Sequence, residues 1–229
     1  MSVPLAQRLL AEALGTALLL ATVVGSGAMG AALAQGNDAV ALLANAGATA
    51  AALYVLVVLF APLSGAHFNP AVTLVMRLRG ELSSRDAIAY VLVQVVAAVA
   101  GVMLAHTMFD LAPLQPGSRA RTGAGQWLSE AVATFGLVLT ILLGARHRPS
   151  AVPGLVAAWI FAAYWFTAST SFANPAVTVA RALTRTFAGI RPEDVGAFVA
   201  AQVAGATIAL LADRRLFPGH GAAAGPTPR

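Results

Sequence analysis

Six long apolar stretches, each rich in small residues, recur along the chain with short connections between them. They run approximately over residues 7–33, 39–63, 86–109, 126–145, 151–168 and 195–211. Because about 20 apolar residues in a helix cross the hydrocarbon core of a bilayer, each stretch predicts a transmembrane helix. The pattern therefore predicts an all-α membrane protein with six spans.

Two further apolar segments, 67–78 and 171–183, are too short to cross a bilayer. One lies between the second and third long stretches, and the other lies between the fifth and sixth. Both contain the pentapeptide Asn-Pro-Ala-Val-Thr, at 69–73 and again at 174–178. A segment that does not span a membrane is tolerated there when protein surrounds it, so both segments predict re-entrant half-helices.

The two half-helices belong to an internal repeat. Glu12 opens the motif Glu-Ala-Leu-Gly-Thr in the first stretch, and Glu130 opens Glu-Ala-Val-Ala-Thr in the fourth. Gln94 and Gln202 precede similar small-residue runs in the third and sixth stretches. Each half thus holds three spans and one half-helix, and an odd number of spans requires the second half to be inverted relative to the first.

We expect a single transmembrane domain over residues 1–217, with repeat one at about 7–109 and repeat two at about 126–216. Residues 218–229 are rich in Gly, Ala and Pro and predict a disordered tail. An excess of arginine marks the cytoplasmic side of membrane proteins, and this bias predicts that both termini are cytoplasmic. Nine arginines would then lie inside, namely Arg8, Arg77, Arg79, Arg85, Arg146, Arg148, Arg214, Arg215 and Arg229, against Arg119, Arg121, Arg181, Arg185 and Arg191 outside.

Composition excludes several other classes of protein. Of the 229 residues, 59% are hydrophobic and only 10% are charged, whereas a soluble domain has about 25% charged residues. All 14 basic residues are arginines, and with nine acidic residues the net charge is +5. Their scattered positions argue against nucleic-acid binding. The chain has no cysteine, which rules out disulfides, thiolate metal sites and cysteine nucleophiles.

An Asn followed by Pro is a favourable start for a helix, because the Asn caps free N–H groups and Pro fits the first helical position. A half-helix of about nine residues is about 13 Å long, close to half of a hydrocarbon core. Two inverted copies would meet near the midplane by their amino ends, where their dipoles oppose cations. With the Asn69 and Asn174 carbonyls turned to their own helices, their NH2 groups would be free to donate hydrogen bonds to a neutral hydroxylated molecule.

On these features the chain is similar to the aquaporin and aquaglyceroporin family, also called major intrinsic proteins. The resemblance covers about residues 9–211, and residues 64–73 are very close to the first signature of the family. It implies an aquaporin-like fold, a passive channel for small uncharged solutes in a lipid bilayer, no cofactor and a homotetramer. The two pore motifs would be Asn69, Pro70 and Ala71, and Asn174, Pro175 and Ala176.

The resemblance also implies roles for residues beside these motifs. Backbone carbonyls would line the pore as acceptors, and Glu12 and Glu130 would be buried carboxylates that hold the two loops. An ordinary role at a helix start is the alternative for each Glu, and a proton pathway is disfavoured because each Glu occurs once per repeat, at a helix start. The carbonyls belong to Gly65, Ala66 and His67 in the first loop and to Thr170, Ser171 and Phe172 in the second.

One position departs from the family. In most relatives an Arg directly follows the second Asn-Pro-Ala and narrows the outer constriction, but Val177 stands here. The spacing in the family places the other constriction residues at Thr49, Ala162 and Ser171. All four are small, which predicts a wide constriction. Arg181, one turn outward from Val177, either replaces part of the missing charge or is a solvated vestibule residue.

The region from Ser169 to Arg185, together with residues 187–192, resembles a bacterial branch of the family that is associated with arsenic resistance. That likeness implies a bacterial inner membrane and, as solutes, water, glycerol-like polyols, arsenous acid and organoarsenicals.

Two functions of other classes remain open. Inverted repeats with broken helices also occur in secondary transporters, which need ionisable coupling groups that these spans largely lack. A membrane-embedded enzyme is the third interpretation, and no nucleophile or metal constellation supports it. His67, His106, His147 and His220 are dispersed, so no metal site is expected.

Overall fold

The structure, a computed structural model, describes residues 3–218, and its regular elements there are all helices. Six of them, counted with the short 3-10 turns that precede α6 and α8, are long and apolar enough to cross a membrane. This confirms the predicted fold class. The six are α1 (Leu5–Leu33), α2 (Asp38–Ser64), α4 (Ser84–Met108), α5 (Ala124–His147), α6 (Val152–Phe166) and α8 (Val195–Leu216).

Two short helices begin at the prolines of the repeated pentapeptide. Helix α3 covers Pro70–Leu78, and α7 covers Pro175–Arg181. The residues before them, which the sequence prediction had included in the half-helices, are not helical, and α7 ends two residues earlier than predicted. The reason is local: Asn69 and Asn174 adopt extended backbone conformations and cap the helices that follow them.

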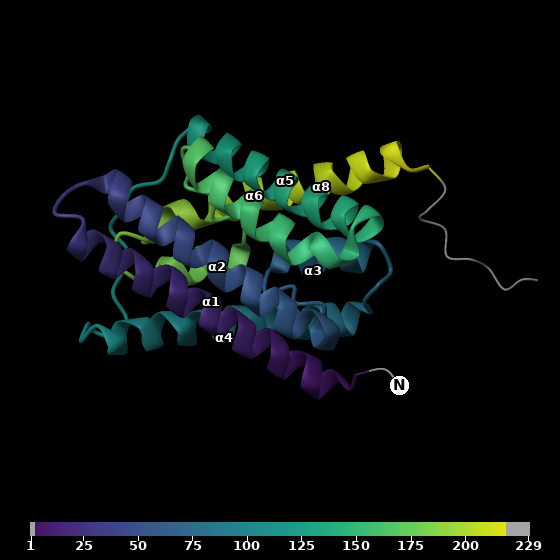
Figure 1. Ribbon diagram of the computed structural model, residues 1–229, viewed down its shortest axis with the longest axis horizontal. Coiled ribbons are helices and arrows are strands. Elements are labelled where there is room, and N and C mark those ends of the chain that lie inside the picture. The colour runs from purple at the N-terminus through teal and green to yellow at the C-terminus, as the bar shows by residue number, and fades with distance from the viewer. Residues whose placement is uncertain (1–2, 219–229) are drawn as a thin grey trace, which may run out of the picture.

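The helices pack as two similar halves. Helix α1 lies against α2 and α4, and α5 lies against α6 and α8. Figure 1 shows these helices running along the same long axis, with α3 and α7 between the halves. Helices α3 and α7 each pack against both α4 and α8. Since α4 belongs to the first half and α8 to the second, each short helix contacts a long helix of both halves.

Glycines bring the packed helices into close contact at one point in each half. A side chain at Gly101 in α4 would collide with the backbone carbonyl of Ala17 in α1, and one at Gly205 in α8 would collide with that of Ala131 in α5. Small residues at such crossings are typical of helix packing in membranes. These contacts fix the long helices around the space that α3 and α7 occupy.

The start of α1 and the end of α8 lie at the same end of the molecule, which we call the terminal face (Figure 1). The opposite end, the distal face, carries the connections 109–123 and 182–194. At the terminal face, Asp213 pairs with Arg79 at 2.9 Å and with Arg146 at 3.0 Å, linking the end of α3 to α5 and α8. The predicted disordered tail lies outside the described residues except for Pro218, and Arg229 also lies outside them.

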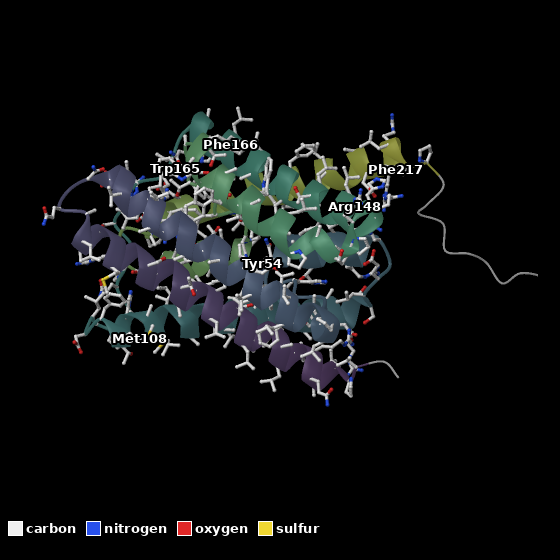
Figure 2. The ribbon with its side chains drawn as sticks, viewed as in Figure 1. Tyr54, Met108, Arg148, Trp165, Phe166 and Phe217 are labelled. Atoms are coloured by element: carbon white, nitrogen blue, oxygen red, sulfur yellow. The ribbon has the colours of Figure 1, made fainter. Side chains whose placement is uncertain are left out.

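Apolar side chains cover the outside of the bundle. Tyr54, Met108, Trp165 and Phe166 project outward in Figure 2, and each is about half exposed. Many leucines and valines on the same surface are also exposed. An apolar exterior of this extent is unfavourable in water and suits contact with lipid.

Candidate functional site

The backbone before α3 is held by a carboxylate from α1. Residues 65–69, which we call the first re-entrant loop, include Ala66 and Phe68 with positive φ angles of 49° and 48°. Such left-handed conformations cost roughly 1–2 kcal/mol per non-glycine residue. Glu12, fully buried, offsets this cost because its oxygens accept hydrogen bonds from the His67 N–H at 2.9 Å and from the Phe68 N–H at 2.7 Å.

The same arrangement recurs before α7. Residues 170–174, the second re-entrant loop, include Ser171 and Ala173 with φ angles of 50° and 49°. The oxygens of the buried Glu130 accept from the Phe172 N–H and the Ala173 N–H, both at 2.9 Å. Both glutamates therefore contact the loops that the resemblance assigned to them, and neither is an ordinary helix-start residue.

Two glutamines complete these networks. The amide of Gln94 donates to Glu12 at 2.9 Å and is 3.0 Å from the Thr73 hydroxyl. Gln202 donates to Glu130 at 2.6 Å and is 2.8 Å from the hydroxyl of Thr178. The sequence showed both glutamines as markers of the repeat but gave them no role. Their matched positions in the two halves of the sequence were the available signal, and the structure shows that both are buried.

Asn69 and Asn174 lie together where the two short helices meet. The Asn69 carbonyl accepts from the Ala71 N–H at 2.9 Å, and the Asn174 carbonyl accepts from the Ala176 N–H at 3.0 Å. Each side chain therefore caps its own helix, and the helices meet by their amino ends.

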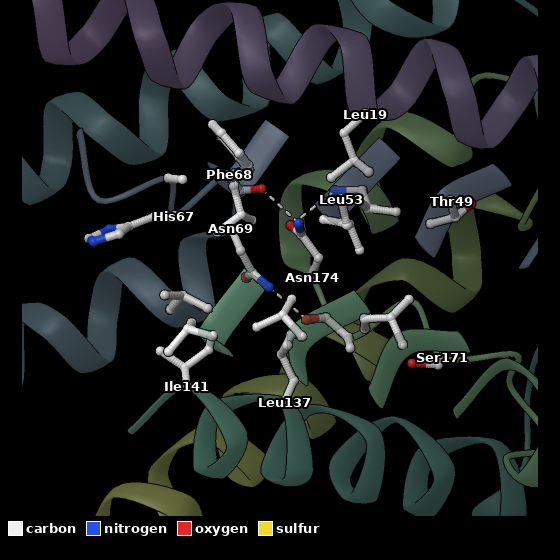
Figure 3. A pocket seen from close by; sticks show the side chains of 18 of the residues that line it. Leu19, Thr49, Leu53, His67, Phe68, Asn69, Leu137, Ile141, Ser171 and Asn174 are labelled. Atoms are coloured by element: carbon white, nitrogen blue, oxygen red, sulfur yellow. Dashed lines mark hydrogen bonds between the residues drawn. The ribbon is translucent and has the colours of Figure 1, made fainter. Parts of the chain in front are cut away.

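The amide nitrogens of the two asparagines were expected to be free, which is only half right. The amide nitrogen of Asn69 donates to the Ala173 carbonyl at 2.8 Å, and that of Asn174 donates to the Phe68 carbonyl at 2.7 Å (Figure 3). An amide NH2 has two hydrogens. One N–H of each asparagine thus joins the halves, and one is left to face the cavity.

A cavity of about 260 Å³ passes both asparagines. In Figure 3, they lie between His67 toward one end and Thr49 and Ser171 toward the other. The wall opposite the loops is mostly apolar. It is formed by Leu19, Val23, Leu53, Val57, Leu137, Ile141, Val156 and Ile160.

Near the distal face, four residues from four segments line this cavity, and we call them the distal cluster: Thr49, Tyr164, Ser171 and Val177. The hydroxyl groups of Thr49 and Tyr164 are 3.3 Å apart. Ala162, predicted to stand here, is exposed on the outside of α6. The prediction was wrong because the face of α6 that is turned to the cavity carries Ile160 and Tyr164, so an aromatic residue takes the place assigned to a small one.

The predicted acceptor carbonyls belong to residues that mostly line the cavity. Gly65, Ala66 and His67 do so in the first re-entrant loop, and Ser171 and Phe172 do so in the second. Thr170 does not belong to the lining. Its hydroxyl is instead 3.4 Å from the guanidinium group of Arg121, behind the loop.

Arg181 is not a solvated vestibule residue, because its side chain is only 1% exposed. It does not line the cavity either, so it has no direct contact with the passage. Arg121, to which the sequence analysis gave no role, is 5% exposed and lies beside the second re-entrant loop. The burial of Arg121 follows from the fold of the connection 109–123, which no local pattern in the sequence indicates.

Ionisable groups in the lining are few. His67 and Glu81 line its terminal half, and the phenol of Tyr164 lines its distal half. The His67 imidazole is 3.1 Å from the Thr73 hydroxyl and packs against the ring of Tyr90. Within residues 3–218, no three His, Asp or Glu side chains are grouped as metal ligands would be.

Comparisons with known proteins agree with this geometry. Residues 1–168 match the family model described as Major intrinsic protein. Aquaglyceroporin AqpS of Rhizobium meliloti (strain 1021) is 61% identical over 206 residues, which cover 90% of this chain and 88% of that protein. Glycerol uptake facilitator protein-like 6 of Lactiplantibacillus plantarum is 31% identical over 146 residues, or 59% of this chain and 62% of the relative. The X-ray structure of the aquaglyceroporin from Plasmodium falciparum shares the fold, with a TM-score of 0.76 over 95% of this chain and 99% of that one at 15% identity.

Proposed function

Because this chain belongs to the major intrinsic protein family, we propose that its cavity is a passive, selective pore whose narrow section is the distal cluster. Proteins of this family are channels, and the chain is an integral, multi-pass membrane protein. Its task is therefore the passage of small uncharged solutes. A channel of this kind needs no cofactor and no bond-making residue, so we assign no enzymatic activity.

One observation carries the proposal. The amides of Asn69 and Asn174 share one cavity, with loop carbonyls beside them and an apolar wall opposite. A solute that crosses gives up hydrogen bonds to water, and these donors and acceptors replace some of them. The apolar wall offers nothing to a hydrated ion, and the amino ends of α3 and α7 add positive potential that opposes cations.

The composition of the distal cluster suggests which solutes pass. Val177 stands where most relatives have an arginine, so no long cation narrows the passage at this point. The hydroxyl groups of Thr49 and Tyr164 offer polar contacts to a polyol. We propose water, glycerol-like polyols and arsenous acid as solutes, with organoarsenicals as the largest of the set. The similarity to an aquaglyceroporin supports the polyol part of this assignment.

The remaining features of the protein are proposals from the family resemblance and the charge pattern. We propose a homotetramer in a bacterial inner membrane, with one pore in each chain and the channel domain over residues 1–217. Eight of the nine arginines that would be cytoplasmic belong to helix ends and connections at the terminal face, namely Arg8, Arg77, Arg79, Arg85, Arg146, Arg148, Arg214 and Arg215. Both termini on the cytoplasmic side would follow from that bias.

Permeation into proteoliposomes tests the assignment of the distal cluster. Thr49→Trp should fill the narrow section and lower glycerol and arsenous acid permeability by about tenfold or more, because a bulky ring in a pore blocks passage sterically. Ala162→Trp makes the same change at the position that faces outward, and it should leave permeability unchanged. Equal effects of both substitutions, or block by Ala162→Trp alone, would contradict the assignment.

The alternative, a secondary transporter, needs a group that binds a coupling ion. Glu12 and Glu130 are fully buried, and their oxygens are occupied by loop N–H groups and by Gln94 and Gln202. His67 and Glu81, the ionisable groups of the terminal half, lie away from the distal cluster. Flux that depends on an imposed proton gradient would favour the transporter over the channel.

A further inference from the structure

Two buried guanidinium groups lie behind the second re-entrant loop. Arg121 comes from the connection between α4 and α5, and Arg181 is the last residue of α7. Both stack on the ring of Phe172, with their Cζ atoms 4.8 and 3.4 Å from its centroid. Phe172 lines the cavity, whereas neither arginine does. One residue of the lining thus contacts two positive charges that lie outside the passage.

Neutral groups hold both guanidinium groups. Arg121 donates from Nε to the Gly189 carbonyl at 3.0 Å and from Nη1 to the Ser169 carbonyl at 2.8 Å. Arg181 donates from Nε to the Ala188 carbonyl, and its Nη1 is buried without a partner among the described residues. Over residues 3–218, neither group is within ion-pair distance of a carboxylate, and no direct contact cancels the two charges.

The nearby acidic groups balance these two charges only in part. Glu130 is fully buried and its single charge attracts both guanidinium groups from beyond ion-pair distance, but its oxygens are engaged with neutral N–H groups of the loop and of Gln202. Asp194 accepts from the Arg121 backbone N–H, but its carboxylate is paired with Arg191 at 3.1 Å. Burial, reinforced by the charge of Arg181, lowers the pKa of Arg121 to about 9. Arg121 therefore keeps its proton at neutral pH.

We infer that Arg121 and Arg181 supply the positive charge that excludes cations from this pore, acting across Phe172 from outside the lumen. The inference rests on the proposed function. A charge in a low-dielectric wall is screened much less than one at the surface, and it raises the energy of a cation that passes nearby. Because both arginines lie outside the lumen, their side chains take no room in it. The pore can therefore be wide at Val177 and still reject cations, a combination that an arginine inside the lumen does not allow.

Removal of either charge tests the inference. Arg121→Met and Arg181→Met keep a long apolar side chain near Phe172 and remove one charge each. Proton and sodium flux would be measured in proteoliposomes under an imposed membrane potential and divided by the glycerol permeability of the same vesicles. Each variant should raise this ratio by about tenfold, the effect of one unit charge near a pore at the effective dielectric of protein sites. Arg185→Met, which removes an exposed arginine from the same face, should leave the ratio unchanged.

A second pair of variants keeps the inference testable if the methionine variants do not fold. The Ser169 hydroxyl accepts from the Ser171 N–H at 3.2 Å, and Asp and Asn side chains also accept in such a turn. Ser169→Asp adds a negative charge near Arg121, whereas Ser169→Asn adds a side chain of the same shape without it. The Asp variant should leak more cations per unit of glycerol flux than the Asn variant.

The outcomes separate the inference from the proposed function. Ratios that stay at the wild-type value in folded Arg121→Met and Arg181→Met, or that agree between the two Ser169 variants, would overturn the inference and leave the channel assignment intact. A rise with Arg185→Met equal to that of the buried positions would assign the effect to net charge and would also overturn it. A wild type with no glycerol permeability above that of empty vesicles would overturn the proposed function, and the inference with it.

Discussion

Two residues before the repeated Asn-Pro-Ala motif, the first re-entrant loop has His67 and the second has Phe172. His67 packs against Tyr90 and lies beside Thr73, and no buried arginine of residues 3–218 contacts it. Phe172 packs against two buried arginines. Yet the loops share a carboxylate, a glutamine, a threonine and an asparagine in matching positions. The shared residues set the position of the backbone, and the residues that differ determine the charge at each end of the cavity.

The largest difference should appear when the two carboxylates are neutralised. Glu12→Gln leaves loop N–H groups short of an acceptor, at a cost of about 1–3 kcal/mol. Glu130→Gln does the same and also removes the buried anion that attracts both Arg121 and Arg181, so the loss should reach about 3–5 kcal/mol. Thermal unfolding of the purified protein in detergent measures both losses. Equal losses would mean that the buried arginines do not depend on Glu130.

The close helix crossings should behave alike in both halves. Gly101→Val and Gly205→Val each place side-chain atoms against the backbone of a partner helix. Each should destabilise the protein by about 1–3 kcal/mol, the usual cost of overpacking. The same unfolding measurement compares them. A loss confined to one half would show that the two crossings, unlike the two carboxylate networks, are not equivalent.

Arginine at the position after each Asn-Pro-Ala should affect the halves differently. Val177→Arg narrows the distal cluster and adds donors that hold water, so permeability to methylated arsenicals should fall about tenfold more than that to water, a difference of about 1.4 kcal/mol in barrier height. Val72→Arg makes the same change in the first half, near His67, and should not reproduce this discrimination. Stopped-flow measurements normalised to the amount of protein would test both. An unchanged ratio for Val177→Arg would place the narrow section elsewhere.

The smallest expected effect concerns the hydroxyl of Tyr164. Tyr164→Phe removes the oxygen that lies 3.3 Å from the Thr49 hydroxyl but keeps the ring. Loss of one neutral hydrogen-bonding group corresponds to about 0.5–1.5 kcal/mol, so glycerol permeability should fall by about two- to tenfold. Water permeability should change less, because water makes fewer contacts with the wall. A larger fall for water than for glycerol would argue against a polyol-binding role for this hydroxyl.

Sequence patterns predicted the spans, the inverted repeat and the two short helices because these follow from local hydrophobicity and from helix capping. They also located Asn69, Asn174 and Val177, which lie inside the repeated motif. They failed at Ala162, where counting by family spacing chose a residue on the wrong face of α6, and therefore missed Tyr164. They also failed at Arg121, because the burial of a residue in a connection depends on where the chain folds back.

Solute uptake by wild-type proteoliposomes under imposed ion gradients tests the central claim most directly. Glycerol and arsenous acid, followed by stopped-flow light scattering, should equilibrate down their own gradients at rates that do not change when a proton or sodium gradient is imposed. Permeability should also stay constant as the solute concentration rises through the low millimolar range. Accumulation of either solute above its external concentration, driven by a pH step, would contradict the account and make the protein a transporter.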